Sequence, residues 1–265
     1  MKKYFAILLP LLLLSACSTV PITGRRQLSI VPASELNAAA LTSYQQLIAE
    51  SKISTDSAAN RMTQQVGQRI AAAAESFLRD AGAADQIQNY SWEFKVIDAP
   101  DTVNAFCMPG GKVAVYTGIL PVTKDEAGLA VVVGHEVAHA LANHGGERMS
   151  QSLLVQLGGM TLSQALGNKS AETRGLLLAA YGVGSNIGVV LPFSRKQEYE
   201  ADHIGLILMA RAGYDPRAAI GFWQRMSQSG GAKPPGFLST HPSDESRIAN
   251  MQAEIPEALK YYVAR

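Results

Sequence analysis

The feature that most constrains this chain is a five-residue motif within an apolar stretch. Residues 135–139 read His-Glu-Val-Ala-His. Residues four apart on an α-helix share one face, one turn apart, so His135 and His139 can bind one metal ion together. Glu136 lies beside them and can act as general base toward a water on that metal. The motif therefore predicts an amphipathic helix that carries a zinc-dependent hydrolytic site.

The residues on either side of the motif predict where this helix begins and ends. Thr123 to Glu126 fit a capping box, with Thr123 at the N-cap and Glu126 three positions later. Asn143, followed by the Gly145-Gly146 pair, predicts the C-terminal end. We therefore expect a helix that starts after Thr123 and stops near Asn143.

Catalytic zinc takes three protein ligands and a water, so the two histidines need a third partner. His144 is the nearest candidate, but it lies about 140° from His139 on a continuing helix, and we interpret it as a cap-region or surface histidine. Glu198 and Asp202 are four residues apart on a predicted helix and share a face. One can bind the metal while the other holds a ligand histidine by its second ring nitrogen. The spacing does not say which carboxylate does which, and Glu200 is expected to point away from both.

The N-terminus has the pattern of an export signal. Two lysines precede a run of apolar residues from Phe5 to Leu14, which is too short to span a bilayer as a helix. The run ends in Leu-Ser-Ala-Cys, a string that resembles the lipobox of bacterial lipoprotein precursors, with Cys17 as its cysteine. An ordinary secretory signal with an accidental cysteine is the alternative.

These features predict the organisation of the chain. We expect a signal peptide over residues 1–16, a lipid on Cys17, a tether over 17–33 and a single metallopeptidase domain over 34–265. In enteric bacteria, a serine after the lipidated cysteine resembles sorting to the outer membrane. The predicted location is therefore the bacterial cell envelope, lipid-anchored and facing the periplasm, with the outer membrane favoured.

Hydrophobic periodicity predicts an α+β fold that is mostly helical. Alternation around Trp92 to Val96 predicts a strand, and two strand-like runs flank the Pro109-Gly110-Gly111 turn within 103–117. We expect this one small sheet to lie beside the motif helix in a zincin-like domain. The other expected helices begin near Ser34 and cover 57–79, 194–213, 216–226 and 242–255.

The stretch from 149 to 193 is apolar and rich in glycine, and residues 175–193 carry no charge. That length raises the question of a membrane span. Its glycines, serine, asparagine and proline favour buried or mobile helices that cover a site instead.

The motifs together resemble the HtpX-type metallopeptidases, family 48 of the metallopeptidases, which are related to the CAAX prenyl protease. The resemblance rests on the HExxH motif, an ExxxD motif roughly sixty residues later, and three further segments, and it covers roughly residues 35–255. Those segments are Asn104-Ala105-Phe106, the turn with the following Val-Tyr-Thr-Gly, and Thr240-His241-Pro242 with Arg247. The resemblance implies one Zn²⁺ per chain with His135, His139 and Glu198 as ligands. It also implies Glu136 as the base and Asp202 as the support of a ligand histidine.

The resemblance also implies how a substrate binds. The segment of Asn104, Ala105 and Phe106 would be an edge strand beside the cleft, where an extended peptide adds by main-chain hydrogen bonds. His241 has two possible active roles: it stabilises the oxyanion of the tetrahedral intermediate, or it occupies the open zinc position and shuts the site. Arg247 can serve in its place or pair with a carboxylate. A solvated loop histidine is the inactive alternative.

Composition excludes other classes of protein. The 265 residues have a formal net charge of +1, with 47% hydrophobic and 17% charged residues. This is a globular composition without a basic stripe, so it gives no support to nucleic-acid binding. We predict an endopeptidase that cuts misfolded or stalled envelope polypeptides. A chaperone-like outer-membrane assembly factor with latent protease activity, and a processing peptidase with one dedicated substrate, are the alternatives.

Overall fold

The structure is a computed structural model that describes residues 17–151, 153–154, 187–229, 237–238, 241 and 245–263, with backbone only for 187–194. The expected signal peptide, and most of the apolar stretch from 149 to 193, lie outside the described residues. Within the described ranges, no helix is both long and apolar enough to cross a bilayer.

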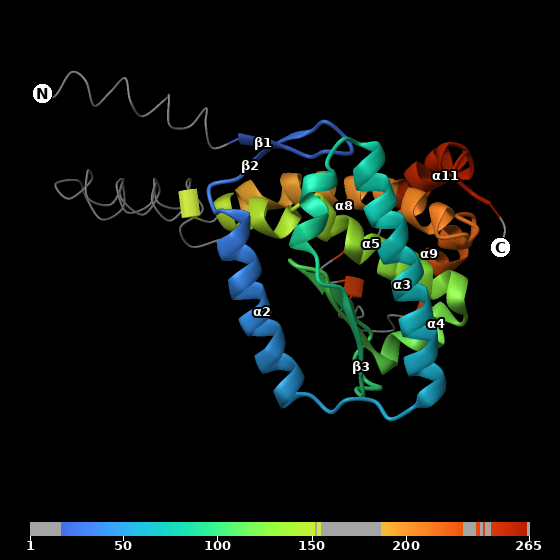
Figure 1. The fold of residues 1–265 in the computed structure, drawn as a ribbon. Helices are drawn as coiled ribbons and strands as arrows, with labels where there is room; N and C mark the ends of the chain where they lie inside the picture. The colour runs from blue at the N-terminus through green and yellow to red at the C-terminus, as the bar shows by residue number, and fades with distance from the viewer. Residues whose placement is uncertain are drawn as a thin grey trace, which may run out of the picture.

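Three helices form the centre of the molecule (Figure 1). They are α3 (Ser57–Asp80), α5 (Glu126–Leu141) and α8 (Ile187–Arg211), and α5 contacts both of the others. Every residue of α5 from Gly128 to His139 is buried. This follows from its nearly uninterrupted run of Val, Ala, Leu and Gly, which leaves no polar face for solvent. The motif residues of α5 are therefore held rigidly in the core.

The helix α5 starts two residues later than the capping box predicted. Its N-cap is Asp125, whose Oδ1 accepts a hydrogen bond of 2.8 Å from the backbone N–H of Gly128. Thr123 instead ends a short helix, α4 (Leu120–Thr123), and its hydroxyl donates to the carbonyl of Leu120. The expectation of Thr123 as N-cap is wrong because Pro121 starts this separate turn of helix.

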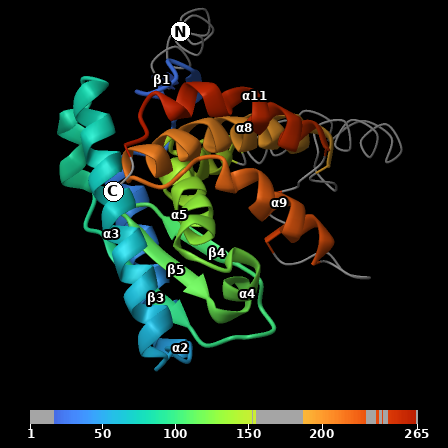
Figure 2. The ribbon, with the colours of Figure 1, turned by 90° about the vertical axis from the view of Figure 1, so that its right-hand side faces the viewer.

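The predicted sheet is present and contains three strands (Figure 2). The strand β5 (Lys112–Tyr116) lies in the middle, parallel to β3 (Glu93–Ile97) and antiparallel to β4 (Ala105–Met108). The strands β4 and β5 form the expected hairpin across the glycine turn, where Gly110 and Gly111 have φ of 84° and 79°. Such positive values favour glycine. The helix α5 contacts β4 and α3 contacts β3, so the sheet lies beside the motif helix and the predicted α+β fold is confirmed.

The remaining elements surround this centre. The segment expected as a tether contains a hairpin, β1 (Cys17–Thr19) paired antiparallel with β2 (Arg26–Leu28), and Val20 in its turn is fully buried. Part of this segment therefore packs on the domain. In Figure 2, α11 runs alongside α8, and these two helices are in contact. The other elements are α2 (Ala33–Glu50), η1 (Ala84–Asn89), η2 (Thr117–Ile119), α9 (Ala218–Gln228) and α11 (Glu245–Leu259).

The helices α5 and α8 approach each other closely at a pair of glycines. A Cβ atom on Gly134 would lie 3.0 Å from the carbonyl oxygen of Gly205, and one on Gly205 would lie 3.0 Å from the backbone nitrogen of His135. The absence of both side chains brings the two backbones together next to the first histidine of the motif. This crossing brings residues of α8 within reach of the imidazoles of α5.

Candidate metal centre

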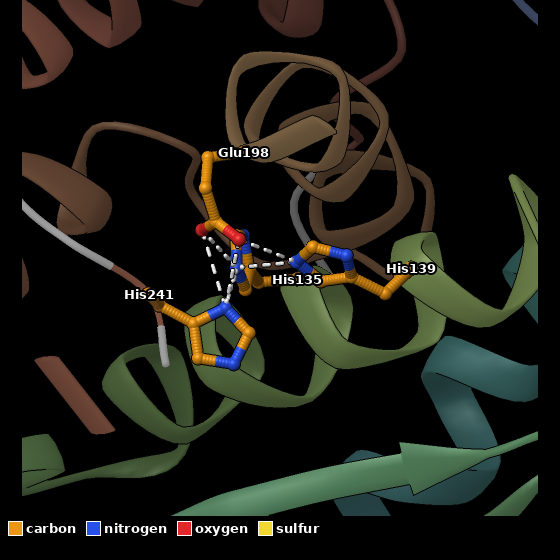
Figure 3. Close-up of side chains that lie close together, drawn as sticks. All are labelled: His135, His139, Glu198 and His241. Atoms are coloured by element: carbon orange, nitrogen blue, oxygen red, sulfur yellow. Dashed lines mark hydrogen bonds and ion pairs between the residues drawn. The ribbon is translucent and has the colours of Figure 1, made fainter. Parts of the chain in front are cut away.

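Four buried side chains from three parts of the chain converge on one point (Figure 3). His135 and His139 come from α5, Glu198 comes from α8, and His241 comes from the segment before α11. One ligand atom from each residue lies within 4.8 Å of all the others. The helix spacing predicted a shared face for the two motif histidines, and the structure brings the glutamate from the ExxxD motif to that face.

The distances among three of these residues fit a single zinc ion. The Nε2 atoms of His135 and His139 lie 3.1 Å apart, and the Glu198 carboxylate oxygens lie 3.3 Å from each of them. Tetrahedral zinc with bonds of about 2.0–2.1 Å separates its ligand atoms by roughly 3.3–3.4 Å. Two imidazoles and one carboxylate are also the donor types that zinc takes in hydrolytic sites. The residues present therefore fit the metal in both spacing and chemistry.

The charge balance of the cluster favours a cation. Burial lowers the pKa of His139 well below its ordinary value. Burial also opposes protonation of His135, but hydrogen bonds to Asp202 and Glu198 outweigh it and raise its pKa to about 9. Burial would raise the pKa of Glu198, yet hydrogen bonds from the three surrounding histidines bring it below its usual range. The site thus holds an ionised carboxylate among imidazoles in the protein interior.

Glu136 lies next to this cluster with one oxygen unsatisfied. Its side chain is buried, and among the described residues its Oε1 has no hydrogen-bond partner. Burial raises the pKa of Glu136 above that of a free glutamate, although the charges of His241 and His135 oppose this rise. A buried polar atom without a partner is costly, so a group such as water is expected to meet it in the active molecule. This is the environment of a carboxylate that accepts a proton.

His241 lies within the cluster rather than in solvent. Its Nδ1 is 3.2 Å from Nε2 of His135 and 3.1 Å from Oε1 of Glu198, and only 7% of the residue is exposed. Its ring packs against Phe237, with ring centroids 4.7 Å apart. The inactive alternative of a solvated loop histidine is therefore wrong, because the imidazole is buried at ligand-like distances.

A carboxylate and an arginine support His135 from behind. Asp202 Oδ1 lies 3.0 Å from Nδ1 of His135, and Arg247 donates to both Asp202 oxygens at 2.5 and 2.7 Å. The same guanidinium lies 3.0 Å from Glu198 Oε2 and stacks on the ring of Trp223. Of the roles considered for Arg247, pairing with a carboxylate is the one for which the structure provides contacts.

His139 is supported by residues that the sequence reasoning missed. The Nδ1 atoms of His139 and His144 lie 2.8 Å apart, and Nε2 of His144 lies 2.9 Å from Oε2 of Glu200. Of the two positions expected for His144, the surface position is wrong, since its side chain is fully buried, whereas the cap-region position agrees with the C-cap of α5 at Ala142. The error came from extending the helix geometry past Leu141, where α5 ends. Asn143 has φ of 53° and redirects the chain into a new helix over 144–151, and this stop signal was visible in the sequence.

The expected substrate segment lies at the edge of the sheet beside α5. Ala105 and Phe106 begin β4, which among the described strands pairs only with β5. Asn104 precedes the strand; its carbonyl accepts from Tyr116, and its side chain accepts from the N–H of Ala105. Cys17 is exposed at the start of β1.

Comparison with known proteins places this site in a family. The model of Peptidase family M48 matches residues 57–255. The chain is 43% identical over 178 residues to the mitochondrial metalloendopeptidase OMA1 of Schizosaccharomyces pombe, which covers 66% of this chain and 50% of the relative. It is 33% identical over 256 residues to human OMA1, covering 91% of this chain and 46% of the relative.

A bacterial relative is also similar. The chain is 30% identical over 159 residues to the beta-barrel assembly-enhancing protease of Escherichia coli, which covers 57% of this chain and 32% of the relative. The chain thus spans about half the length, or less, of these relatives. The matched region contains α3, the sheet, α5, α8 and most of α11, which together carry the cluster. The chain therefore belongs to peptidase family M48, the family of zinc-dependent metallopeptidases.

Proposed function

We propose that this chain is a zinc-dependent endopeptidase with His135, His139 and Glu198 as its metal ligands and Glu136 as its general base. The observation that carries this proposal is a pair of imidazole Nε2 atoms 3.1 Å apart, each 3.3 Å from one oxygen of the Glu198 carboxylate. Beside them lies the buried Glu136, whose Oε1 makes no hydrogen bond within the described part of the chain. The names of the OMA1 relatives, which are metalloendopeptidases, support cleavage within a polypeptide chain.

The mechanism follows from the positions of these side chains. Bound zinc supplies Lewis-acid chemistry, acidifying a water and polarising the substrate carbonyl. Glu136 accepts the proton of the attacking water, since its raised pKa brings it nearer the operating pH. The same carboxyl group then donates this proton to the leaving nitrogen of the peptide. Asp202 and Arg247 hold the ring of His135 in place throughout, so the ligand geometry is set before substrate binds.

An extended substrate would bind along β4. The strand has one partner among the described strands, so its outer edge offers main-chain donors and acceptors to a peptide. Recognition through main-chain atoms tolerates many side chains, and it requires the substrate to be unfolded. The proposed substrates are therefore misfolded or stalled polypeptides, with Asn104, Ala105 and Phe106 at the start of the binding edge.

His241 is proposed to keep the resting enzyme closed. Its Nδ1 lies as close to His135 and Glu198 as the metal ligands lie to one another, which supports a fourth-ligand position. A substrate or partner would then have to displace this imidazole before cleavage. In the alternative role, His241 stays in place and its Nε2, which lies 3.4 Å from Glu136 Oε1, donates to the oxyanion.

The location we propose is the periplasmic side of a bacterial envelope, with a lipid on Cys17, in a stand-alone relative of the HtpX-type enzymes. The export-signal pattern before Cys17 supports this location, as does the similarity to the E. coli protease. The name of that relative, a beta-barrel assembly-enhancing protease, favours one second candidate function. In this alternative, the chain assists outer-membrane assembly and its proteolysis is latent.

One experiment tests the endopeptidase and separates it from the alternatives. Purified chain is incubated with casein as an unfolded substrate, with zinc, with a chelator, and with zinc restored after chelation. Cleavage that stops with chelator and returns with zinc is the expected result. Intact casein in the presence of a fully zinc-loaded chain would instead favour the assembly factor or a dedicated processing enzyme.

A further inference from the structure

The two motif histidines are each supported by an arginine-bound carboxylate, but in different ways. His135 is held by Asp202, and Asp202 is held by Arg247. On the other side, His139 contacts His144, His144 contacts Glu200, and Glu200 is held by Arg25. The first support comes from α8 and α11 within the core. The second reaches outward to the N-terminal hairpin.

Arg25 lies at the hairpin turn and binds two carboxylates at once. Its Nε donates to Glu200 Oε2 at 2.5 Å, and its two terminal nitrogens donate to the two oxygens of Glu147 at 2.9 Å each. The side chain is 12% exposed and those of Glu147 and Glu200 are 4% and 6% exposed, so these ion pairs are buried. The hydroxyl of Thr23 also donates to Glu200.

The hairpin holds this arginine in a fixed position. The backbone N–H of Val20 donates to the carbonyl of Arg25 at 2.8 Å, and Val20 is fully buried. Gly24 has φ of 68°, which lets the chain turn back before Arg25. In Figure 1 the hairpin lies next to α8 at the top of the molecule, as the contact with Glu200 requires.

We call the contacts from His139 through His144 to Glu200 the relay. The tautomers of its two histidines decide which atom donates each hydrogen bond. A histidine that binds metal through Nε2 carries its proton on Nδ1, so His139 donates to Nδ1 of His144. His144 must then accept at Nδ1 and carry its own proton on Nε2, which it donates to Glu200. An ionised Glu200 therefore fixes the tautomer of His144, and His144 fixes the ring of His139. Arg25 holds Glu200 in the position that completes this sequence.

We propose that Arg25 is a positioning residue for the zinc ligand His139, acting through Glu200 and His144. The N-terminal hairpin is in this view part of the metal centre. The inference rests on the proposed zinc site, but it concerns the affinity for the metal rather than cleavage. Residues that orient metal ligands from behind contribute about 10- to 100-fold to affinity or activity.

The experiment compares two carboxylates that share one arginine. Zinc affinity is measured by competition with a chromophoric chelator, and the ligand field is measured from the visible spectrum of the cobalt-substituted chain. Arg25→Ala, His144→Ala and Glu200→Gln are expected to weaken zinc binding about tenfold or more and to change the cobalt spectrum. Glu147→Gln, which touches Arg25 outside the relay, and Arg26→Ala, an exposed neighbour, are expected to keep both readouts at wild-type values.

Several outcomes overturn the inference. Wild-type zinc affinity in a folded Arg25→Ala variant does so, and so does an equal loss in Glu147→Gln and Glu200→Gln, since the arginine would then only secure the hairpin. If Arg25→Ala does not fold, the Glu200→Gln and Glu147→Gln pair decides alone. A wild-type chain that binds zinc and leaves casein intact contradicts the proposed function and not this inference, whereas one that binds no zinc contradicts both.

Discussion

Glu136 Oε1 and His241 Nε2 lie 3.4 Å apart, so the proposed base faces the histidine that is proposed to close the metal cluster. The same two residues differ in origin, since Glu136 is fixed on the buried helix α5 and His241 precedes α11. A substrate carbonyl at the metal would have to enter between them. Substitution of Glu136 and substitution of His241 are therefore expected to change the rate of cleavage in opposite directions.

Glu136→Gln should nearly abolish proteolysis while zinc stays bound, because glutamine cannot take the proton of water and none of the proposed ligands changes. The expected fall in kcat is about 10²- to 10⁴-fold, the usual contribution of a general base. Casein cleavage is measured together with the zinc content of the same sample. Near wild-type turnover by the zinc-loaded variant would remove Glu136 from the role of base.

His241→Ala should increase the rate of casein cleavage, because the variant cannot fill the fourth position around the metal. The rate is expected to rise by the reciprocal of the fraction of wild-type molecules that are open at equilibrium. Self-cleavage of the purified variant should rise as well. A fall of about 10²-fold at matched zinc content would assign His241 to the oxyanion instead, and an unchanged rate would leave it without either role.

Glu198→Gln should lower the affinity for zinc by more than roughly 100-fold, which is beyond the range typical of residues that only orient ligands. Glu200→Ala should lower the affinity for zinc by a smaller factor, since Glu200 contacts His144 and is not one of the four residues of the metal cluster. Glu50→Gln on the exposed end of α2 serves as a matched control. Zinc content after dialysis against a chelator series ranks the variants, and equal zinc in the Glu198 and Glu200 variants would count against Glu198 as the third ligand.

Cys17→Ser should block lipidation and leave the signal uncleaved or miscleaved, since the thiol is the acceptor of the lipid in the proposed precursor. Radiolabelled fatty acid is followed in cells that express either form. Label on the variant, or its absence from the wild type, would contradict the lipoprotein assignment.

Gly205→Ala should destabilise the protein and weaken zinc binding together. The new methyl group would lie 3.0 Å from the backbone nitrogen of His135, so the two helices must separate at the ligand itself. Overpacking of this kind costs about 1–3 kcal/mol of unfolding free energy. Urea denaturation measures it, and Gly145→Ala, where a methyl group meets nothing within 4 Å, is the control. Equal effects of the two substitutions would show that the helix crossing does not set the ligand position.

Much of the architecture could be predicted because it is encoded locally. The spacing of His135 and His139 required only a helix, and the glycine turn between β4 and β5 required only backbone conformations that glycine adopts. The family and its metallopeptidase class, predicted from the motifs, are confirmed by the match over residues 57–255.

The supports behind the ligands could not be predicted in the same way. Arg25 and Glu200 are far apart in sequence, and no periodicity connects a hairpin turn to the face of a distant helix. His144 was misplaced because its position depends on a change of chain direction at Asn143, whereas helix geometry describes a continuing helix. Thr123 was misassigned as N-cap because it ends the separate helical turn α4, which contains Pro121, and Asp125 caps α5 instead.

The two arginines that hold the ligand supports lie early and late in the sequence, Arg25 before α2 and Arg247 within α11. During synthesis, the HExxH helix emerges well before Arg247 can reach Asp202. A nascent chain that has exposed the motif histidines therefore still lacks the arginine that holds Asp202 against His135. The support of His135 is therefore complete only once α11 has packed against α8 and placed Arg247 on Asp202.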